Sequence, residues 1–231
     1  PFENIYRLRY YELLDEVFDS NFLSEGKFVK EFEREFKKFQ GLESIAFDGW
    51  ASAMDSVLSY VDIKGWDVVV PSNTFMATPL SVVKNGGNVV FADCNRNDLC
   101  LGLESLKSSI TEKTKAVIIV HIGGHIAFEI NEISEYCQNK GITLIEDCAH
   151  AHGASFKGNA PGSYGIGGVY SFYSTKTLTV GEGGMLVSKD EELISFAKKW
   201  RNYGKPNGTI LFSVFLGTLH ISSFIVFSDK W

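Results

Sequence analysis

The chain has 231 residues, of which 45% are hydrophobic and 22% charged, an ordinary globular composition that predicts a sizeable buried core. Its 22 lysine and arginine residues against 28 aspartate and glutamate residues give a net charge of −6. This balance argues against a nucleic-acid partner, because a non-specific nucleic-acid-binding domain is normally basic. The four cysteines, Cys94, Cys100, Cys137 and Cys148, form no CxxC pair, so we expect reduced thiols, no metal site and a cytoplasmic location.

Both ends of the chain bear on membrane targeting. The opening residues Pro1 to Asn4 carry neither a basic nor an apolar leader region, so no signal peptide is predicted. The most apolar stretch, 209–227, is interrupted by Gly217, His220 and five hydroxyl residues. A membrane helix needs roughly 18 or more apolar residues in succession. We therefore expect no membrane partner.

In chain order, the first clear pattern is an amphipathic helix in which Phe28, Phe32 and Phe36 recur at i, i+4 and i+8. We interpret this aromatic stripe as core or interface packing. Short β-branched runs then predict strands at 68–70, 88–91, 116–120 and 142–145. Helical patterns between them lie at about 49–61, 75–85, 103–110 and 131–139. Continuous apolar runs indicate strands that are buried on both faces, and their alternation with helices predicts an α/β fold with a mostly parallel sheet.

From about residue 168 the pattern changes. Two further strands, 169–172 and 185–187, are separated by only twelve residues. This is short for a crossover helix, so we interpret the link as a loop with a special role. Ser188-Lys189-Asp190-Glu191 reads as a capping box that opens a last helix.

Four features fall at the carboxyl ends of the predicted strands, where open α/β sheets bind ligands. Asp147 ends a strand, and Lys176 precedes a glycine loop as a candidate Schiff-base amine. The turn at 48–53 presents backbone N–H groups suited to a phosphate, and Phe75 is placed to stack on a planar ligand. Each feature alone also has an ordinary explanation: a turn or cap aspartate, a solvated lysine, a tight turn, a core ring. Together they are the set that pyridoxal 5′-phosphate (PLP) requires.

Two other cofactor-binding patterns are missing from the sequence. No GxGxxG follows a predicted strand, which argues against a dinucleotide site, and no GxxxxGK[ST] phosphate loop is present. Several longer motifs carry a resemblance to a known family instead. They are Ile145–Ala154, Gly162–Gly165, Ser171–Lys176 and Gly181–Gly184, preceded by Ser24–Glu33 and Val70–Thr78.

Over about residues 20–206 these motifs resemble the DegT/DnrJ/StrS family of PLP-dependent sugar aminotransferases, which have fold type I. The resemblance implies a PLP-binding large domain over 1–206, with a mostly parallel sheet flanked by helices. It also implies a divergent or truncated segment over 207–231 in place of the family's smaller C-terminal domain. Segment 216–224 resembles a family motif that helps to complete the partner subunit's site, but it lacks the arginine.

The resemblance assigns roles to individual residues. Lys176 would be the catalytic Schiff-base lysine, and Asp147 would pair with the pyridinium nitrogen. A dehydrating lineage of the family carries histidine at the lysine position, so Lys176 favours transamination. The remaining cofactor contacts would come from His150 beside the ring hydroxyl, Phe75 over the ring face, and Ser171 with the backbone of Trp50 and Ala51 at the phosphate. One departure is that the family's usual Gly-Thr in the phosphate turn reads Gly49-Trp50 here.

The implied function is amino transfer from an amino acid, by resemblance glutamate, to a nucleotide-linked keto-sugar, in polysaccharide or amino-sugar biosynthesis. The implied assembly is a homodimer. Two alternatives stay open. One is a non-catalytic remnant of the family that at most binds PLP. The other is a cyclitol aminotransferase, because the same motifs would serve it.

Overall fold

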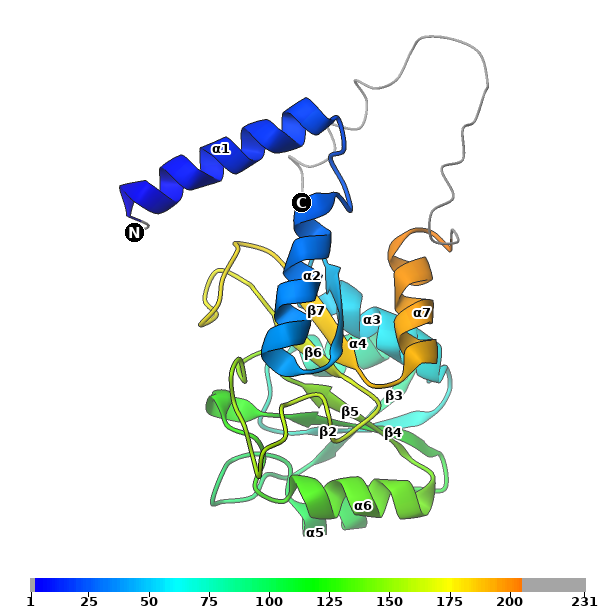
Figure 1. Ribbon diagram of the computed structural model, residues 1–231. Helices are drawn as coiled ribbons and strands as arrows, with labels where there is room; N and C mark the ends of the chain where they lie inside the picture. The colour runs from blue at the N-terminus through cyan, green and yellow to red at the C-terminus, as the bar shows by residue number, and fades with distance from the viewer. Residues whose placement is uncertain (1–2, 205–231) are drawn as a thin grey trace.

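A computed structural model describes residues 3–204 of the chain. The apolar stretch 209–227, the segment 216–224 and the predicted terminal segment 207–231 lie outside these described residues. Within them, the strands form one seven-stranded sheet in the order β1-β7-β6-β5-β4-β2-β3 (Figure 1). The strands are β1 (Glu43–Phe47), β2 (Asp67–Pro71), β3 (Asn88–Ala92), β4 (Thr114–Val120), β5 (Thr143–Asp147), β6 (Gly168–Ser171) and β7 (Gly184–Ser188).

The sheet is mostly parallel, as predicted. β3, β2, β4, β5 and β6 pair in parallel along the sheet. β7 is antiparallel to both of its neighbours, β6 and β1, so β1 runs in the same direction as β6. The short link between β6 and β7 follows from this, because an antiparallel neighbour needs no crossover helix.

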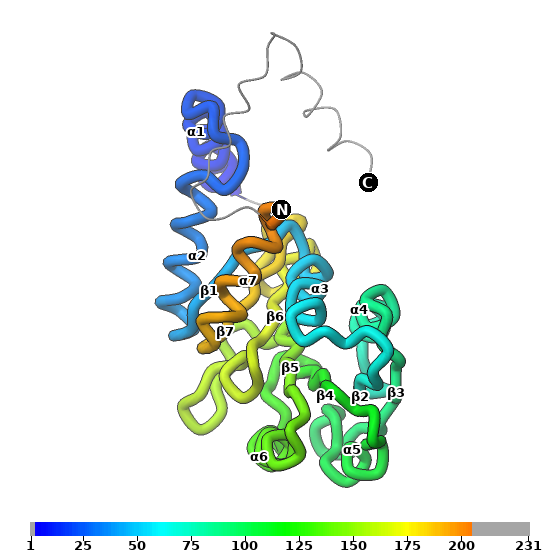
Figure 2. The backbone as a smooth tube through the Cα atoms, turned by 90° about the vertical axis from the view of Figure 1, so that its right-hand side faces the viewer, coloured from blue at the N-terminus to red at the C-terminus, as the bar shows by residue number. Residues whose placement is uncertain are grey.

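Helices cover both faces of the sheet (Figures 1 and 2). They are α2 (Lys27–Gln40), α3 (Trp50–Val61), α4 (Ala77–Lys84), α5 (Leu103–Ser109), α6 (Ile130–Lys140) and α7 (Glu191–Arg201), whereas α1 (Asn4–Ser20) lies away from the sheet. Alternate strand residues face opposite sides. Val68 and Val70 therefore pack with α3, α4 and α7, whereas Val69 packs with α5 and α6. Burial on both faces explains why these strands read as continuous apolar runs.

Two rings of the aromatic stripe of α2, Phe32 and Phe36, pack in the core, which is one of the two roles expected for the stripe. The ring of Phe36 lies 5.1 Å from that of Tyr170 and 5.5 Å from that of Phe172, and Phe32 also contacts Phe172 at 5.1 Å. α5 and α6 cover one face of the sheet over β2 to β5. These rings cover the same face over β6 and β7. The stripe thereby anchors α2 to the sheet.

No strand was predicted for β1, and two further features differ from the sequence interpretation. The capping box was assigned wrongly: α7 begins at Glu191, and its N-cap is Asp190, whose carboxylate accepts the Leu193 N–H at 2.9 Å. Ser188 remains in β7, where it pairs with Glu43 of β1, and its hydroxyl donates to the Ile166 carbonyl. The second of these features is α1, which was not predicted; none of its residues is buried, and it extends away from the sheet (Figures 1 and 2). Within residues 3–204, no helix is both long and apolar enough to cross a membrane.

Candidate active site

The four sequence features meet at one edge of the sheet. Because β1, β2, β5 and β6 run in the same direction, their carboxyl ends lie on the same side. Asp147 is the last residue of β5 and Ser171 the last residue of β6. The start of α3 follows β1, and Phe75 follows β2. This edge is where open α/β sheets bind ligands.

Asp147 is a buried carboxylate, 4% exposed, that accepts three hydrogen bonds. Its Oδ1 accepts the indole N–H of Trp50 at 3.1 Å and the Ala149 N–H at 3.0 Å. Its Oδ2 accepts the Thr78 hydroxyl at 3.0 Å. Burial raises the pKa of Asp147, and the three donors together with the charge of Lys176 oppose that rise. A positively charged donor placed against this group would restore its ionised form.

Lys176 lies half-buried in the loop between β6 and β7, which begins with a turn in which its N–H donates to the Tyr173 carbonyl at 2.9 Å. Burial lowers the pKa of its amine, and the charge of Asp147 opposes that shift. The two groups therefore lie within electrostatic range of each other. A lowered pKa increases the neutral fraction of the amine, which is the nucleophilic form.

Two histidines follow Asp147. Burial and then the charge of Lys176 lower the pKa of His150, which places His150 within electrostatic range of Lys176. Burial lowers the pKa of His152 to about 4. Its ring packs against Tyr170 and Phe172, at 5.3 and 5.2 Å, and neither ring nitrogen has a hydrogen-bond partner among residues 3–204. His152 was not singled out from the sequence.

The start of α3 provides backbone donors beside Ser171. The first intrahelical hydrogen bond runs from the Ala53 N–H to the Gly49 carbonyl, which leaves the preceding N–H groups, including those of Trp50 and Ala51, without a partner in the helix. Gly184 pairs with Ser171 across β6 and β7, and a Cβ on Gly184 would overlap the Gly49 carbonyl. The missing side chain thus lets the helix start approach the strand next to Ser171. Donors of this kind fit a phosphate group.

Phe75 presents its ring to solvent, with 77% of the residue exposed. It is not a core residue. Its neighbours in the chain tie it to the site, because the Thr74 hydroxyl donates to the Thr78 hydroxyl at 2.9 Å and Thr78 in turn donates to Asp147. The ring thereby belongs to the same edge as the carboxylate and is free to contact a planar ligand.

The donor set matches PLP. A buried carboxylate suits a pyridinium N–H, a half-buried lysine suits an aldehyde, and the amides of the α3 start with the Ser171 hydroxyl suit a phosphate. Over Gly49, a Cβ would meet nothing within 4 Å, so the turn leaves open space there. No local pattern predicts that the indole of Trp50 or the hydroxyl of Thr78 donates to Asp147. The only signal in the sequence is that Trp50 lies in the turn at 48–53 and Thr78 lies three residues after Phe75.

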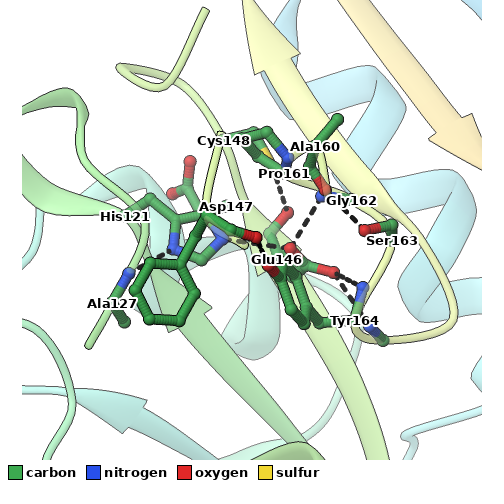
Figure 3. Close-up of polar contacts among 12 residues, drawn as sticks. His121, Ala127, Glu146, Asp147, Cys148, Ala160, Pro161, Gly162, Ser163 and Tyr164 are labelled. Atoms are coloured by element: carbon green, nitrogen blue, oxygen red, sulfur yellow. Dashed lines mark hydrogen bonds and ion pairs between the residues drawn. The ribbon is translucent and has the colours of Figure 1, made fainter. Parts of the chain in front are cut away.

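Glu146, the neighbour of Asp147, serves a different purpose (Figure 3). It is fully buried, and its oxygens accept the backbone N–H groups of Gly162, Tyr164 and Gly165 at 2.7 to 2.8 Å. His121 is the fourth donor, at 3.0 Å, because its Nδ1 accepts the Ala127 N–H and its Nε2 must therefore carry the proton. These four bonds fill the carboxylate and fasten two loops behind the site.

Acid, thiol and imidazole groups come together in two places. Glu146 and His121 lie near Cys148, but the lone pairs of Glu146 are already used by N–H donors. Asp98, Cys100 and His125 form the other group. There Asp98 accepts the N–H groups of Cys100 and Phe128, and the imidazole of His125 donates to the Asp98 carbonyl. Hydrogen bonds to the backbone thus account for both groups.

Comparison with known proteins agrees with this geometry. The profile of the DegT/DnrJ/EryC1/StrS aminotransferase family matches residues 7–217. A GDP-perosamine synthase of Vibrio cholerae is 35% identical over 198 residues, covering 84% of this chain and 54% of that protein. The chain thus spans about half the length of such relatives.

Solved structures show the same fold. DesI, crystallised in the presence of its TDP-sugar product, superposes with a TM-score of 0.82 at 31% identity, covering 86% of this chain and 50% of that one. A GDP-4-keto-6-deoxymannose-3-dehydratase with a trapped PLP–glutamate geminal diamine superposes at 0.77 with 28% identity, covering 84% and 52%. The fold is therefore that of the fold-type-I PLP enzymes, as predicted. The chain belongs to the DegT/DnrJ/EryC1/StrS aminotransferase family, whose cofactor is PLP.

Proposed function

We propose that this chain is the PLP-binding part of a cytoplasmic aminotransferase that moves an amino group from glutamate to a nucleotide-linked keto-sugar. The observation that carries the proposal is that buried Asp147 and half-buried Lys176 lie within electrostatic range of each other at the carboxyl edge of the sheet. The nucleotide-sugar acceptor is supported by the names of the similar proteins, and the glutamate donor by the amino acid trapped in the similar dehydratase. A dehydratase also lies among these proteins. By the family resemblance, the dehydrating lineage carries histidine at the position of Lys176, so the lysine favours amino transfer over dehydration.

PLP supplies an aldehyde that condenses with amines and a ring that withdraws electrons from the adjoining carbon. Asp147 would hold the ring nitrogen in its protonated form, which strengthens that withdrawal. Ser171 and the N–H groups of Trp50 and Ala51 would bind the phosphate, and Phe75 would cover the ring face and exclude water. His150 would lie beside the ring hydroxyl.

Lys176 has two tasks in this proposal. Its amine would hold the cofactor in the resting protein. Nζ would also serve as the base that takes the proton from the α-carbon of the amino acid, and would move a proton at the carbon of the keto-sugar that receives nitrogen. The lowered pKa of Lys176 suits a general base, because more of the amine is unprotonated at a given pH.

The assembly proposed with this function is a homodimer. Next to the site, Phe75, Met76, Leu80 and Val83 are all exposed apolar residues. No residue of α1 is buried, although helices in proteins gain most of their stability from packing. A second copy of the chain would cover such surfaces. Sedimentation should show dimers or larger species that Leu80→Glu weakens and the surface change Lys107→Glu does not. A monodisperse monomer would contradict this assembly.

Chemical labelling tests the function itself. Borohydride reduction of the PLP-loaded 231-residue chain, followed by peptide mapping, should place the pyridoxyl group on Lys176. Lys176→Ala should remove the label and abolish amino transfer while leaving non-covalent PLP binding. Label on another lysine, such as Lys157, would overturn the assignment. A chain that binds no PLP would support the non-catalytic alternative, and amino transfer to a keto-cyclitol but not to a nucleotide-linked keto-sugar would support the cyclitol alternative.

A further inference from the structure

Trp50 contributes more to the site than its backbone. It is the first residue of α3 and only 9% exposed. Its indole reaches across to the end of β5, where Nε1 donates to Asp147 Oδ1 at 3.1 Å. The side chain thus connects the proposed phosphate turn to the proposed partner of the ring nitrogen.

The hydrogen bonds of Asp147 can be counted oxygen by oxygen. A carboxylate has about four lone-pair positions, two on each oxygen. Oδ1 accepts two N–H groups, from Trp50 and Ala149, and is therefore filled. Oδ2 accepts one hydroxyl, from Thr78, whose own oxygen receives the Thr74 proton. One acceptor position remains, and it lies on Oδ2.

We propose that Trp50 is a positioning residue that acts through Asp147, by filling Oδ1 and thereby directing the last acceptor position, on Oδ2, to the ring N–H of PLP. This inference rests on the proposed function, because it requires that the cofactor binds here. It concerns the indole, whereas the family resemblance concerns only the backbone of this turn.

The chemistry of indole suits the task. The indole N–H donates and cannot accept, so it never competes with Asp147 for a proton. A hydrogen bond to the charged form of a buried acid favours that form. Without the indole, the carboxylate would rotate more freely and would be protonated more readily. Both changes weaken its hold on a protonated ring.

The test compares PLP with 1-deaza-PLP, in which a carbon replaces the ring nitrogen. Both bind the same phosphate and aldehyde contacts, but only PLP uses Asp147. The full chain should bind PLP more tightly than the analogue. Trp50→Phe should weaken PLP binding about tenfold, corresponding to one hydrogen bond to a charged group, and leave the affinity for the analogue almost unchanged. Trp66→Phe, a change at an exposed tryptophan, is the matched control.

A double-mutant cycle adds a second readout. In an Asp147→Asn background, Trp50→Phe should lower the affinity for PLP little further, because the carboxylate through which Trp50 acts is already absent. Equal weakening of both ligands by Trp50→Phe, or additive losses in the cycle, would show a packing role and overturn the proposal. Tighter PLP binding in Trp50→Phe would overturn it as well, since the indole would then be obstructing the cofactor.

A measurement without PLP separates this inference from the proposed function. Carbon-13 NMR of labelled aspartate carboxyls, with Asp147→Asn to identify the signal, reports the pKa of Asp147 in the unliganded chain. Trp50→Phe should raise that pKa, and an unchanged value would overturn the positioning role. If the wild-type chain binds neither ligand, the proposed function fails and the directing role toward PLP fails with it. The NMR titration still decides whether Trp50 stabilises the carboxylate.

Discussion

Glu146 and Asp147 are consecutive carboxylates at the end of β5, both almost completely buried, yet they face opposite sides of the sheet. Glu146 accepts four hydrogen bonds, three of them from the backbone, and has no lone pair left. Asp147 accepts three, from two side chains and one backbone N–H, and has one position left. The difference separates an acid that fastens loops from one that can receive a ligand.

The hydrogen-bond partners of the two acids also differ in whether they can accept a hydrogen bond as well as donate one. Backbone N–H groups only donate, so an amide replacing Glu146 must direct its NH2 group at another donor. The partner of Asp147 Oδ2 is the Thr78 hydroxyl, which can accept as well as donate. An amide at 147 can therefore donate to Thr78 while its oxygen keeps the two N–H groups. The same chemical change should have opposite consequences at the two positions.

The largest expected effect concerns catalysis at Asp147. Asp147→Asn should slow exchange of the α-proton of glutamate by about a hundredfold or more, about 3 kcal/mol in activation free energy, because a neutral amide does not keep the ring nitrogen protonated. NMR of glutamate in deuterated water with the PLP-loaded chain measures the rate. Asp62→Asn, at an exposed position, is the control. Exchange at the wild-type rate in Asp147→Asn would remove the distinction drawn between the two acids.

Stability should show the reverse order. Glu146→Gln should lower the free energy of unfolding by about 3 kcal/mol, since it sets an amide NH2 against buried N–H donors and loses a buried charge that they stabilise. Asp147→Asn should change it by less than about 1 kcal/mol. Urea unfolding followed by circular dichroism measures both. Equal losses in the two variants would show that the number of filled lone pairs does not distinguish these acids.

The histidines extend the comparison. Both ring nitrogens of His121 are bound, whereas neither nitrogen of His152 has a partner among residues 3–204. Burial lowers the pKa of His152 to about 4, so between pH 6.5 and 4 the unfolded chain binds a proton that the folded chain does not. This lowers stability as the pH falls through that window, by about 2 kcal/mol after allowance for partial exposure. His152→Phe should remove this part of the acid loss in urea unfolding; an unchanged pH profile would contradict the assignment.

The smallest effect is the pH dependence that Asp147 itself contributes. Its pKa is raised in the folded chain, so above the unfolded value of 3.8 the folded chain binds more protons. The group therefore stabilises the unliganded chain fully below pH 3.8, and this contribution is lost as the pH rises through the folded pKa. Compared with Asp147→Asn, the wild type should lose stability across that window, which urea unfolding at a series of pH values measures. A difference curve that is flat, or that slopes the other way, would mean that the three donors outweigh burial.

Local pattern sufficed for much of this molecule. The apolar runs predicted every strand except β1, because burial on both sides of a mostly parallel sheet demands such runs wherever they occur in the chain. The motif around Asp147 and Lys176 predicted the cofactor, since both residues follow strands whose carboxyl ends must meet at one edge. The start of α7 was misplaced by two residues, because Ser188 and Asp190 are both good caps and the pairing of β7 decides between them.

Long-range contacts decided the rest. Trp50 and Thr78 lie 97 and 69 residues from Asp147 in the chain, and no local pattern indicates that both donate to it. Nor does the sequence Glu146-Asp147 tell which acid is filled by backbone donors, because that depends on which face of the sheet each one meets. The chain sequence specifies which groups are available for chemistry. Packing at the sheet edge specifies which of them keep a free lone pair, because hydrogen-bond partners are shared out only when distant segments come together.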